Sequence, residues 1–211
     1  MIIPSTSLTF FLAFASSDGW EEVHTMDPGT ARGQAIAALL ALGPDSLDQD
    51  QLKLAWEAGK RAAEGLELDL ALQLQRPLFE LAPAEWSGIN LAITLQRLGD
   101  WRATDDVMGA LLSGHSLADP AGTWSQRGIF ALGAGEHLLA REYLGRALCL
   151  GSADASAILA REDLAHNHIQ SARAGFRAAL AGDSEHPWAL RGWGLSLLGT
   201  PPVLTGEKQP N

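Results

Sequence analysis

Along most of the chain, apolar and small residues recur at intervals of three or four positions, the spacing of one face of an α-helix. The pattern is clearest between Trp124 and Leu148, where the key positions are Trp124, Gly128, Ala131, Gly135, Ala140, Leu144 and Ala147. These offsets predict a helix, a tight turn and a second helix packed antiparallel to the first. Small residues stand where the two backbones come close, and large residues fill the space between them.

The same spacing predicts helices in the rest of the chain. Besides the pair in 124–148, the expected helices cover 30–42, 48–63, 66–81, 85–98, 101–112, 154–165, 169–181 and 187–198. Pro77 falls inside one of these helices and is expected to kink or split it, because proline lacks the backbone donor. Sustained strand-like alternation is missing from the sequence, apart from a short run at 8–14. We therefore expect an all-α protein of about ten helices.

The helix pairs repeat along the chain. The small residue near the start of each second helix is Ala71, Thr104, Ala140 or Ala172, at steps of 33, 36 and 32 residues. The longest step coincides with the loop at 114–121, an insertion between units, where an array of repeats tolerates it. A single pair cannot bury its own apolar face, so such units are expected to stack on one another.

The order of residues in 124–148, a Trp, then a Gly, then a small residue ahead of a large one, resembles the tetratricopeptide repeat (TPR) family, whose unit is about 34 residues. The resemblance covers 48–198, and it departs from the family pattern at Thr104, at Pro77 and in lacking an aromatic residue before Ala71. It implies a right-handed superhelical solenoid of antiparallel helix pairs over 27–199. Residues 1–26 are expected to form an N-terminal arm or extension, and 200–211 a flexible tail.

The resemblance also implies a function, which is to bind a peptide or partner protein in a concave groove lined by the first helix of each pair. The positions that match the groove are Lys53, Trp56, Lys60, Trp86, Ile89, Asn90, Ile93, Arg97, Gln126, Ile129, Ile158, Arg161 and Trp193. Aromatic rings beside cations suit an extended peptide with acidic groups. Lys60, Asn90 and Arg97 partly resemble the residues with which some members hold a terminal carboxylate. Solvated surface cations, and packing between repeats by Trp56 and Trp86, are the alternatives.

The net charge limits which partners are expected, and the cysteine content limits covalent cross-links. The 211 residues include 15 Lys and Arg against 25 Asp and Glu, a net charge of −10. This balance argues against nucleic acid or an anionic membrane as the main partner, since both require clustered cations. Cys149 is the single cysteine, so an internal disulfide is excluded, and we expect it to be buried as a small apolar residue.

Recognisable catalytic motifs are missing from the sequence. The sequence contains no Gly-rich phosphate loop, no HExxH and no GxSxG, so we expect neither enzymatic activity nor a cofactor. His166 and His168 stand near Glu162 and Asp163, but residues two apart on a helix point to different faces, so we expect no metal site there. His137 occupies a turn position where the family often has an aromatic residue, which favours a packing role.

The N-terminal region has three open interpretations. The apolar run at 8–15 is far shorter than the roughly 20 residues that span a bilayer. Residues 1–26 are a docked arm, an extension ahead of a true start at Met26, or a signal peptide that lacks the usual Lys or Arg. We expect a cytoplasmic protein, and a secreted or periplasmic one if 1–15 is a signal peptide.

The sequence thus favours a non-catalytic interaction scaffold with a protein or peptide partner, and neither nucleic acid nor membrane binding. The alternative is a regulatory or co-chaperone module of a larger transcription or enzyme complex. A monomer is expected, and a rod built by stacking of exposed repeat ends is the competing arrangement.

Overall fold

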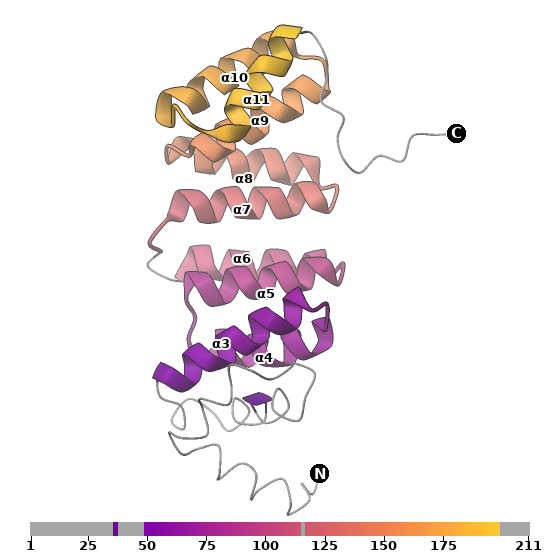
Figure 1. The fold of residues 1–211 in the computed structure, drawn as a ribbon, viewed down its shortest axis with the longest axis vertical. Helices are drawn as coiled ribbons and strands as arrows, with labels where there is room; N and C mark the ends of the chain where they lie inside the picture. The colour runs from indigo at the N-terminus through magenta and orange to yellow at the C-terminus, as the bar shows by residue number, and fades with distance from the viewer. Residues whose placement is uncertain (1–35, 38–48, 115–116, 199–211) are drawn as a thin grey trace, which may run out of the picture. The chain divides into compact units, whose positions relative to one another are not determined.

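The structure is a computed structural model, and it describes residues 36–37, 49–114 and 117–198. Within these ranges the chain is helical and has no strand (Figure 1). The helices are α3 (Gln49–Glu64), α4 (Leu68–Leu81), α5 (Glu85–Arg97), α6 (Trp101–Gly114), α7 (Pro120–Gly133), α8 (His137–Cys149), α9 (Ala153–Ala165), α10 (Ile169–Gly182) and α11 (Pro187–Leu198). The all-α prediction and the helices expected between 48 and 198 are confirmed. The expected arm at 1–26, nearly all of the helix at 30–42 and the tail at 200–211 lie outside the described residues.

The chain divides into two units, Met1–Val107 (unit 1) and Met108–Asn211 (unit 2), with the boundary inside α6. In unit 1, α4 packs against both α3 and α5, and α3 also contacts α5. In unit 2, each helix from α7 to α11 packs against the next one. In addition, α9 contacts α7 and α11, so the first helices of successive pairs lie beside one another. Each unit is therefore built of neighbouring helix pairs, as an all-α repeat fold requires.

The small residues predicted to let helices approach are at the centres of the contacts. Ala71, Thr104, Ala140 and Ala172 are each 0% exposed. A Cβ atom on Gly128 would lie 2.6 Å from Cγ of Leu144 in the paired helix, which is closer than real Cβ contacts allow. A Cβ atom on Gly192 would collide with the ring of Phe176. The spacing of small residues thus sets how closely the helices pack.

The turn between the two helices of each pair has the same backbone geometry every time. One residue adopts a left-handed conformation, namely Leu66, Gly99, Gly135 or Asn167, with φ between 63° and 80°. The next N–H then reaches back to a carbonyl in the last turn of the first helix: Glu67 to Ala62, Asp100 to Leu95, Glu136 to Ala131 and His168 to Asp163, over 2.8–3.0 Å. This is the Schellman arrangement, which satisfies carbonyls that the helix end leaves open. Each left-handed residue stands five positions before the buried small residue, so the turn and the contact recur together.

Three local expectations differ from the structure. Pro77 lies inside α4, which runs unbroken from Leu68 to Leu81, so the expected split is wrong; the proline removes a single backbone bond, and the rest of the helix holds. Cys149 is exposed, since the buried stripe of α8 runs through Ala140, Tyr143, Leu144 and Ala147 and does not include position 149. The His137 side chain is 65% exposed, so it does not pack in the turn.

None of the described helices is long and apolar enough to cross a membrane.

Candidate functional site

The predicted groove residues of unit 1 lie on α3 and α5, two helices that contact each other. Trp56 of α3 and Trp86 of α5 meet edge to face, with ring centroids 5.6 Å apart. The Lys60 ammonium lies 5.8 Å from the centroid of the Trp56 ring and 3.9 Å from the Glu64 carboxylate on the same helix. Trp86 is 40% exposed, so part of this aromatic pair is open to solvent. We call the area formed by Trp56, Lys60, Trp86, Asn90 and Arg97 the α3–α5 surface.

Asn90 and Arg97 lie on the same face of α5 as Trp86, and each side chain already donates a hydrogen bond to a backbone carbonyl. Asn90 Nδ2 donates to the carbonyl oxygen of Trp86 over 2.7 Å. Arg97 Nη1 donates to the carbonyl oxygen of Ala63 over 2.7 Å and so ties the end of α5 to the end of α3. Each side chain has further donors, because an amide carries two N–H groups and a guanidinium five. Lys60, Asn90 and Arg97 thus belong to one unit, and each already has a partner within it.

The remaining groove residues of unit 1 fall on the same helices. Lys53 is exposed on α3, and Ile89 and Ile93 are half-buried on α5. Trp56 is also half-buried, packed against a core cluster that includes Leu74. The Trp56 Nε1 atom is buried without an acceptor among the described residues. The ring therefore contributes to packing as well as to the surface, and both interpretations of it have support.

A buried polar bridge holds α3, α4 and α5 together beneath this surface. Gln75 of α4 accepts a 2.6 Å hydrogen bond from Thr94 Oγ1 and donates a 3.2 Å bond to the carbonyl oxygen of Gly59. Gln75 is 2% exposed and Thr94 0%. The bridge fixes the spacing of the helices that carry the two tryptophans. Sequence reasoning missed it, although an uncharged Gln and Thr within apolar stripes were a signal for a buried polar pair.

The groove residues expected in unit 2 lie on α7, α9 and α11. Ile129 is half-buried against the core cluster that contains Leu144. Gln126, also on α7, is half-buried, but Ile158 is only 2% exposed, so the prediction that it lines a surface is wrong. Its position points into the contact with the neighbouring helix, where an apolar side chain is core.

Arg161 and Trp193 were both expected to line the groove, but each pairs with a different residue. The Arg161 guanidinium lies 5.7 Å from the ring of Trp188, at the start of α11. Trp193 packs on the core cluster that includes Phe176, and the Arg177 guanidinium lies 5.7 Å from its ring. Each tryptophan of α11 thus has its own arginine from another helix.

An aromatic and cationic cluster on α7 and α8 was not predicted. The rings of Trp124 and Tyr143 have centroids 5.8 Å apart. Arg127 lies 4.2 Å from the Tyr143 ring centroid and 5.5 Å from that of Trp124. Arg146 lies 4.7 Å from the Trp124 ring and donates a 2.7 Å bond to Glu142. These residues stand three apart on each helix, and that spacing was the signal in the sequence.

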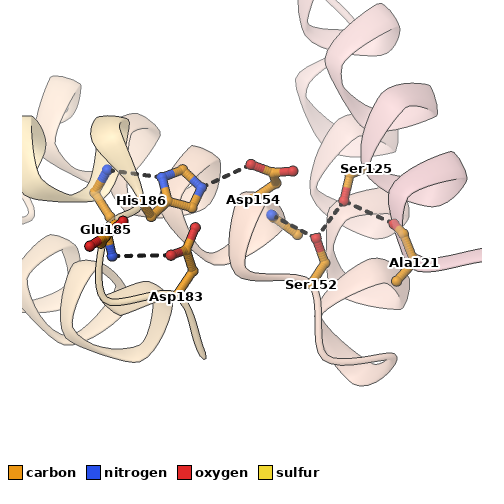
Figure 2. Close-up of polar contacts among 9 residues, drawn as sticks. Ala121, Ser125, Ser152, Asp154, Asp183, Glu185 and His186 are labelled. Atoms are coloured by element: carbon orange, nitrogen blue, oxygen red, sulfur yellow. Dashed lines mark hydrogen bonds and ion pairs between the residues drawn. The ribbon is translucent and has the colours of Figure 1, made fainter. Parts of the chain in front are cut away.

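Two helix caps in unit 2 each contact a neighbouring first helix (Figure 2). The hydroxyl groups of Ser125 in α7 and Ser152 lie 2.8 Å apart. Ser152 Oγ also accepts from the N–H of Ala155 over 3.1 Å, which caps α9. This polar contact joins the N-terminal parts of two first helices.

A second link of the same kind joins α9 to α11 (Figure 2). His186 is 5% exposed, and its Nε2 atom lies 2.8 Å from Oδ1 of Asp154. Its Nδ1 atom accepts from the N–H of Ala189 over 3.3 Å at the start of α11. The imidazole therefore caps one helix while it contacts another.

The acidic residues near the histidines are engaged within the protein. Asp163 accepts a 2.6 Å hydrogen bond from Ser171 Oγ and a 3.2 Å bond from Arg141 Nη2. Glu162 Oε2 lies 3.8 Å from Nδ1 of His137. Within the part of the chain that the structure describes, no group of three or more His, Cys, Asp or Glu is arranged to hold a metal ion. The arrangement fits structural cross-links between α8, α9 and α10.

No protein-family model matches the sequence, and no curated protein is recognisably similar to it.

Proposed function

We propose that this chain is a non-catalytic, TPR-like interaction scaffold that binds a partner peptide on the α3–α5 surface. The proposal includes the right-handed winding that the resemblance implies. The single observation that carries it is the contact of Trp56 and Trp86 across two first helices, with Lys60 beside the Trp56 ring.

The chemistry of the surface favours an acidic peptide with an apolar anchor. The exposed edge of Trp86 offers apolar area at little cost in side-chain entropy. Lys60 and Arg97 are exposed cations of this surface, and Lys60 lies 3.9 Å from the Glu64 carboxylate. An Asp, a Glu or a terminal carboxylate placed near them would gain charge-assisted hydrogen bonds. An aliphatic or aromatic side chain next to it would cover the tryptophan edge.

The underlying structure keeps this surface in one arrangement. The Gln75 bridge fixes the spacing of three helices, and the bond from Arg97 to the Ala63 carbonyl closes one end. A surface that is already ordered loses less entropy when a peptide binds.

Panning a displayed random-peptide library on the protein tests the proposal. We expect enrichment of peptides that place an acidic group beside an aliphatic or aromatic residue. The substitutions Lys60→Glu and Trp86→Ala should each weaken binding of an enriched peptide about tenfold or more. Arg76→Glu is the matched control, because Arg76 is an exposed cation on α4, away from this face.

Arg97 is avoided as the first substitution, since its bond to Ala63 gives it a role in the fold. Peptides that bind all three variants as they bind the wild type would show that the α3–α5 surface is not the site.

A further inference from the structure

The outward face of α11 is apolar and has no covering element among the described residues. Leu190 is 50% exposed, Leu197 57% and Leu198 78%. Together with Gly194 they stand at the intervals that place residues on one side of a helix. The opposite side, with Ala189, Gly192 and Ser196, is buried against the rest of unit 2. We call Leu190, Gly194, Leu197 and Leu198 the α11 face.

No packing contact among the described residues explains why a glycine stands at position 194, in the centre of this face. A Cβ atom on Gly128 or Gly175 would lie less than 3.0 Å from a residue of another helix, so those glycines permit helix contacts. A Cβ atom on Gly194 would meet nothing within 4 Å. A glycine inside a helix is unfavourable relative to alanine, and Gly128 and Gly175 occupy positions where a second helix comes close.

Cations flank the apolar strip, and carboxylates are missing from the helices that form it. Helices α10 and α11 contain Arg173, Arg177 and Arg191 but no Asp or Glu. Arg177 lies over Trp193 on one side of α11, and Arg191 is exposed on the other. Arg173 is used inside the unit, where it donates a 2.7 Å bond to the carbonyl oxygen of Ser196. The α11 face is therefore a basic, apolar area on an acidic chain.

These charges decide between possible occupants. Two copies that met through this face would bring Arg177 and Arg191 towards their own counterparts without a carboxylate on either helix, which is unfavourable. An anionic membrane requires a cluster of about four to eight cations, whereas the exposed arginines beside this face are Arg177 and Arg191. An amphipathic helix with acidic residues beside its apolar stripe satisfies both the leucines and the arginines.

We propose that the α11 face is a docking site for an acidic amphipathic helix of a partner protein, with its closest approach at Gly194. This site lies in unit 2 and is independent of the peptide surface proposed in unit 1. The partner helix would take the role that a second helix takes in each complete pair, with its leucine-type side chains on the α11 face.

The test uses the full chain and a labelled synthetic helix of about five turns made of Ala, Leu and Glu. The control peptide has the same sequence with Lys in place of every Glu. Fluorescence anisotropy should show binding of the Glu peptide and none of the Lys peptide. The double substitution Arg177→Glu, Arg191→Glu should weaken binding at least about tenfold.

The substitution Gly194→Leu distinguishes a loss of docking from a loss of folding. Because the position opens to empty space, this variant should unfold at the same temperature as the wild type or higher, while peptide binding falls about tenfold or more. Gly145→Leu is the matched control: Gly145 is also a helical glycine with nothing within 4 Å, and its substitution should leave binding unchanged.

Four results would overturn the proposal. They are no binding of the Glu peptide, equal binding of both peptides, binding that survives Gly194→Leu, and binding to phosphatidylglycerol vesicles in place of the peptide. A dimer in light scattering that Leu197→Glu dissolves would show instead that a second copy occupies the face.

Discussion

His186 and Asp154 join the N-terminal ends of α11 and α9 through a 2.8 Å contact between Nε2 and Oδ1. The N–H of Ala189 donates to Nδ1 of the same ring over 3.3 Å. One imidazole thus contacts a helix end and a second helix at once.

Replacing His186 with alanine should lower the free energy of unfolding by about 1–3 kcal/mol, because a cap and a buried bond are lost together. Urea denaturation followed by circular dichroism measures this. Asp154→Ala is the comparison, since the Asp154 side chain is 68% exposed and its loss should cost less than about 1 kcal/mol. Equal losses for the two variants would mean that the capping bond to Ala189 contributes nothing.

Leu66→Gly should stabilise the protein by about 1 kcal/mol. Leu66 is 74% exposed and has φ of 63°, so its side chain gains little from packing while its backbone is in a region that favours glycine. Thermal unfolding is the measurement. The reciprocal change Gly135→Ala, at φ of 80°, should destabilise by a similar amount. A lower melting temperature for Leu66→Gly would show that the leucine side chain has a contact that outweighs the strain.

Two glycines of one helix pair should respond oppositely to substitution by alanine. Gly128→Ala should cost about 1–3 kcal/mol, because the new Cβ would lie 2.6 Å from Leu144 Cγ and force α7 and α8 apart. Gly145→Ala in α8 should be neutral or stabilising by up to about 1 kcal/mol, since nothing lies within 4 Å. Chemical denaturation of both variants checks the pair, and a stable Gly128→Ala protein would refute the close packing of these helices.

The bridge through Gln75 should show coupling. Thr94→Val removes the donor to Gln75 Oε1, and Gln75→Ala removes both bonds and leaves the Gly59 carbonyl without its side-chain donor. Each change should cost about 1–3 kcal/mol. In a double-mutant cycle the two should be non-additive by about 1 kcal/mol, whereas strict additivity would show that the bond does not contribute.

The periodicity of the sequence was sufficient to predict the helices and their pairing, because the contacts that define them are local. Ala140 and Gly128 both belong to one hairpin, and small residues there leave few alternatives. The left-handed turn was signalled only where a glycine fills it. Leu66 and Asn167 adopt it because the closed hairpin imposes it, which residue preferences alone do not reveal.

The features of the candidate site that were missed depend on contacts between distant residues or with backbone atoms. Arg97 is bound to the carbonyl of Ala63, an atom that no side-chain pattern identifies. The Arg161 guanidinium lies near Trp188 and not near Trp193, because the rotation of α11 about its axis determines which tryptophan faces it. The burial of Ile158 and the exposure of Cys149 were also predicted wrongly. Ile158 lies in a contact with a neighbouring helix and Cys149 at the end of α8, and at such positions the helix face that a residue occupies does not predict its burial.

Polar contacts join the first helices of unit 2 in their N-terminal halves, from Ser125 to Ser152 and from Asp154 to His186. The C-terminal ends of α9 and α11 are held as well, by bonds from Arg141 and Ser171 to Asp163 and from Arg173 to the Ser196 carbonyl oxygen. Separating neighbouring helix pairs would therefore break directional bonds whichever end opened first, so we expect unit 2 to unfold as one cooperative block and not pair by pair.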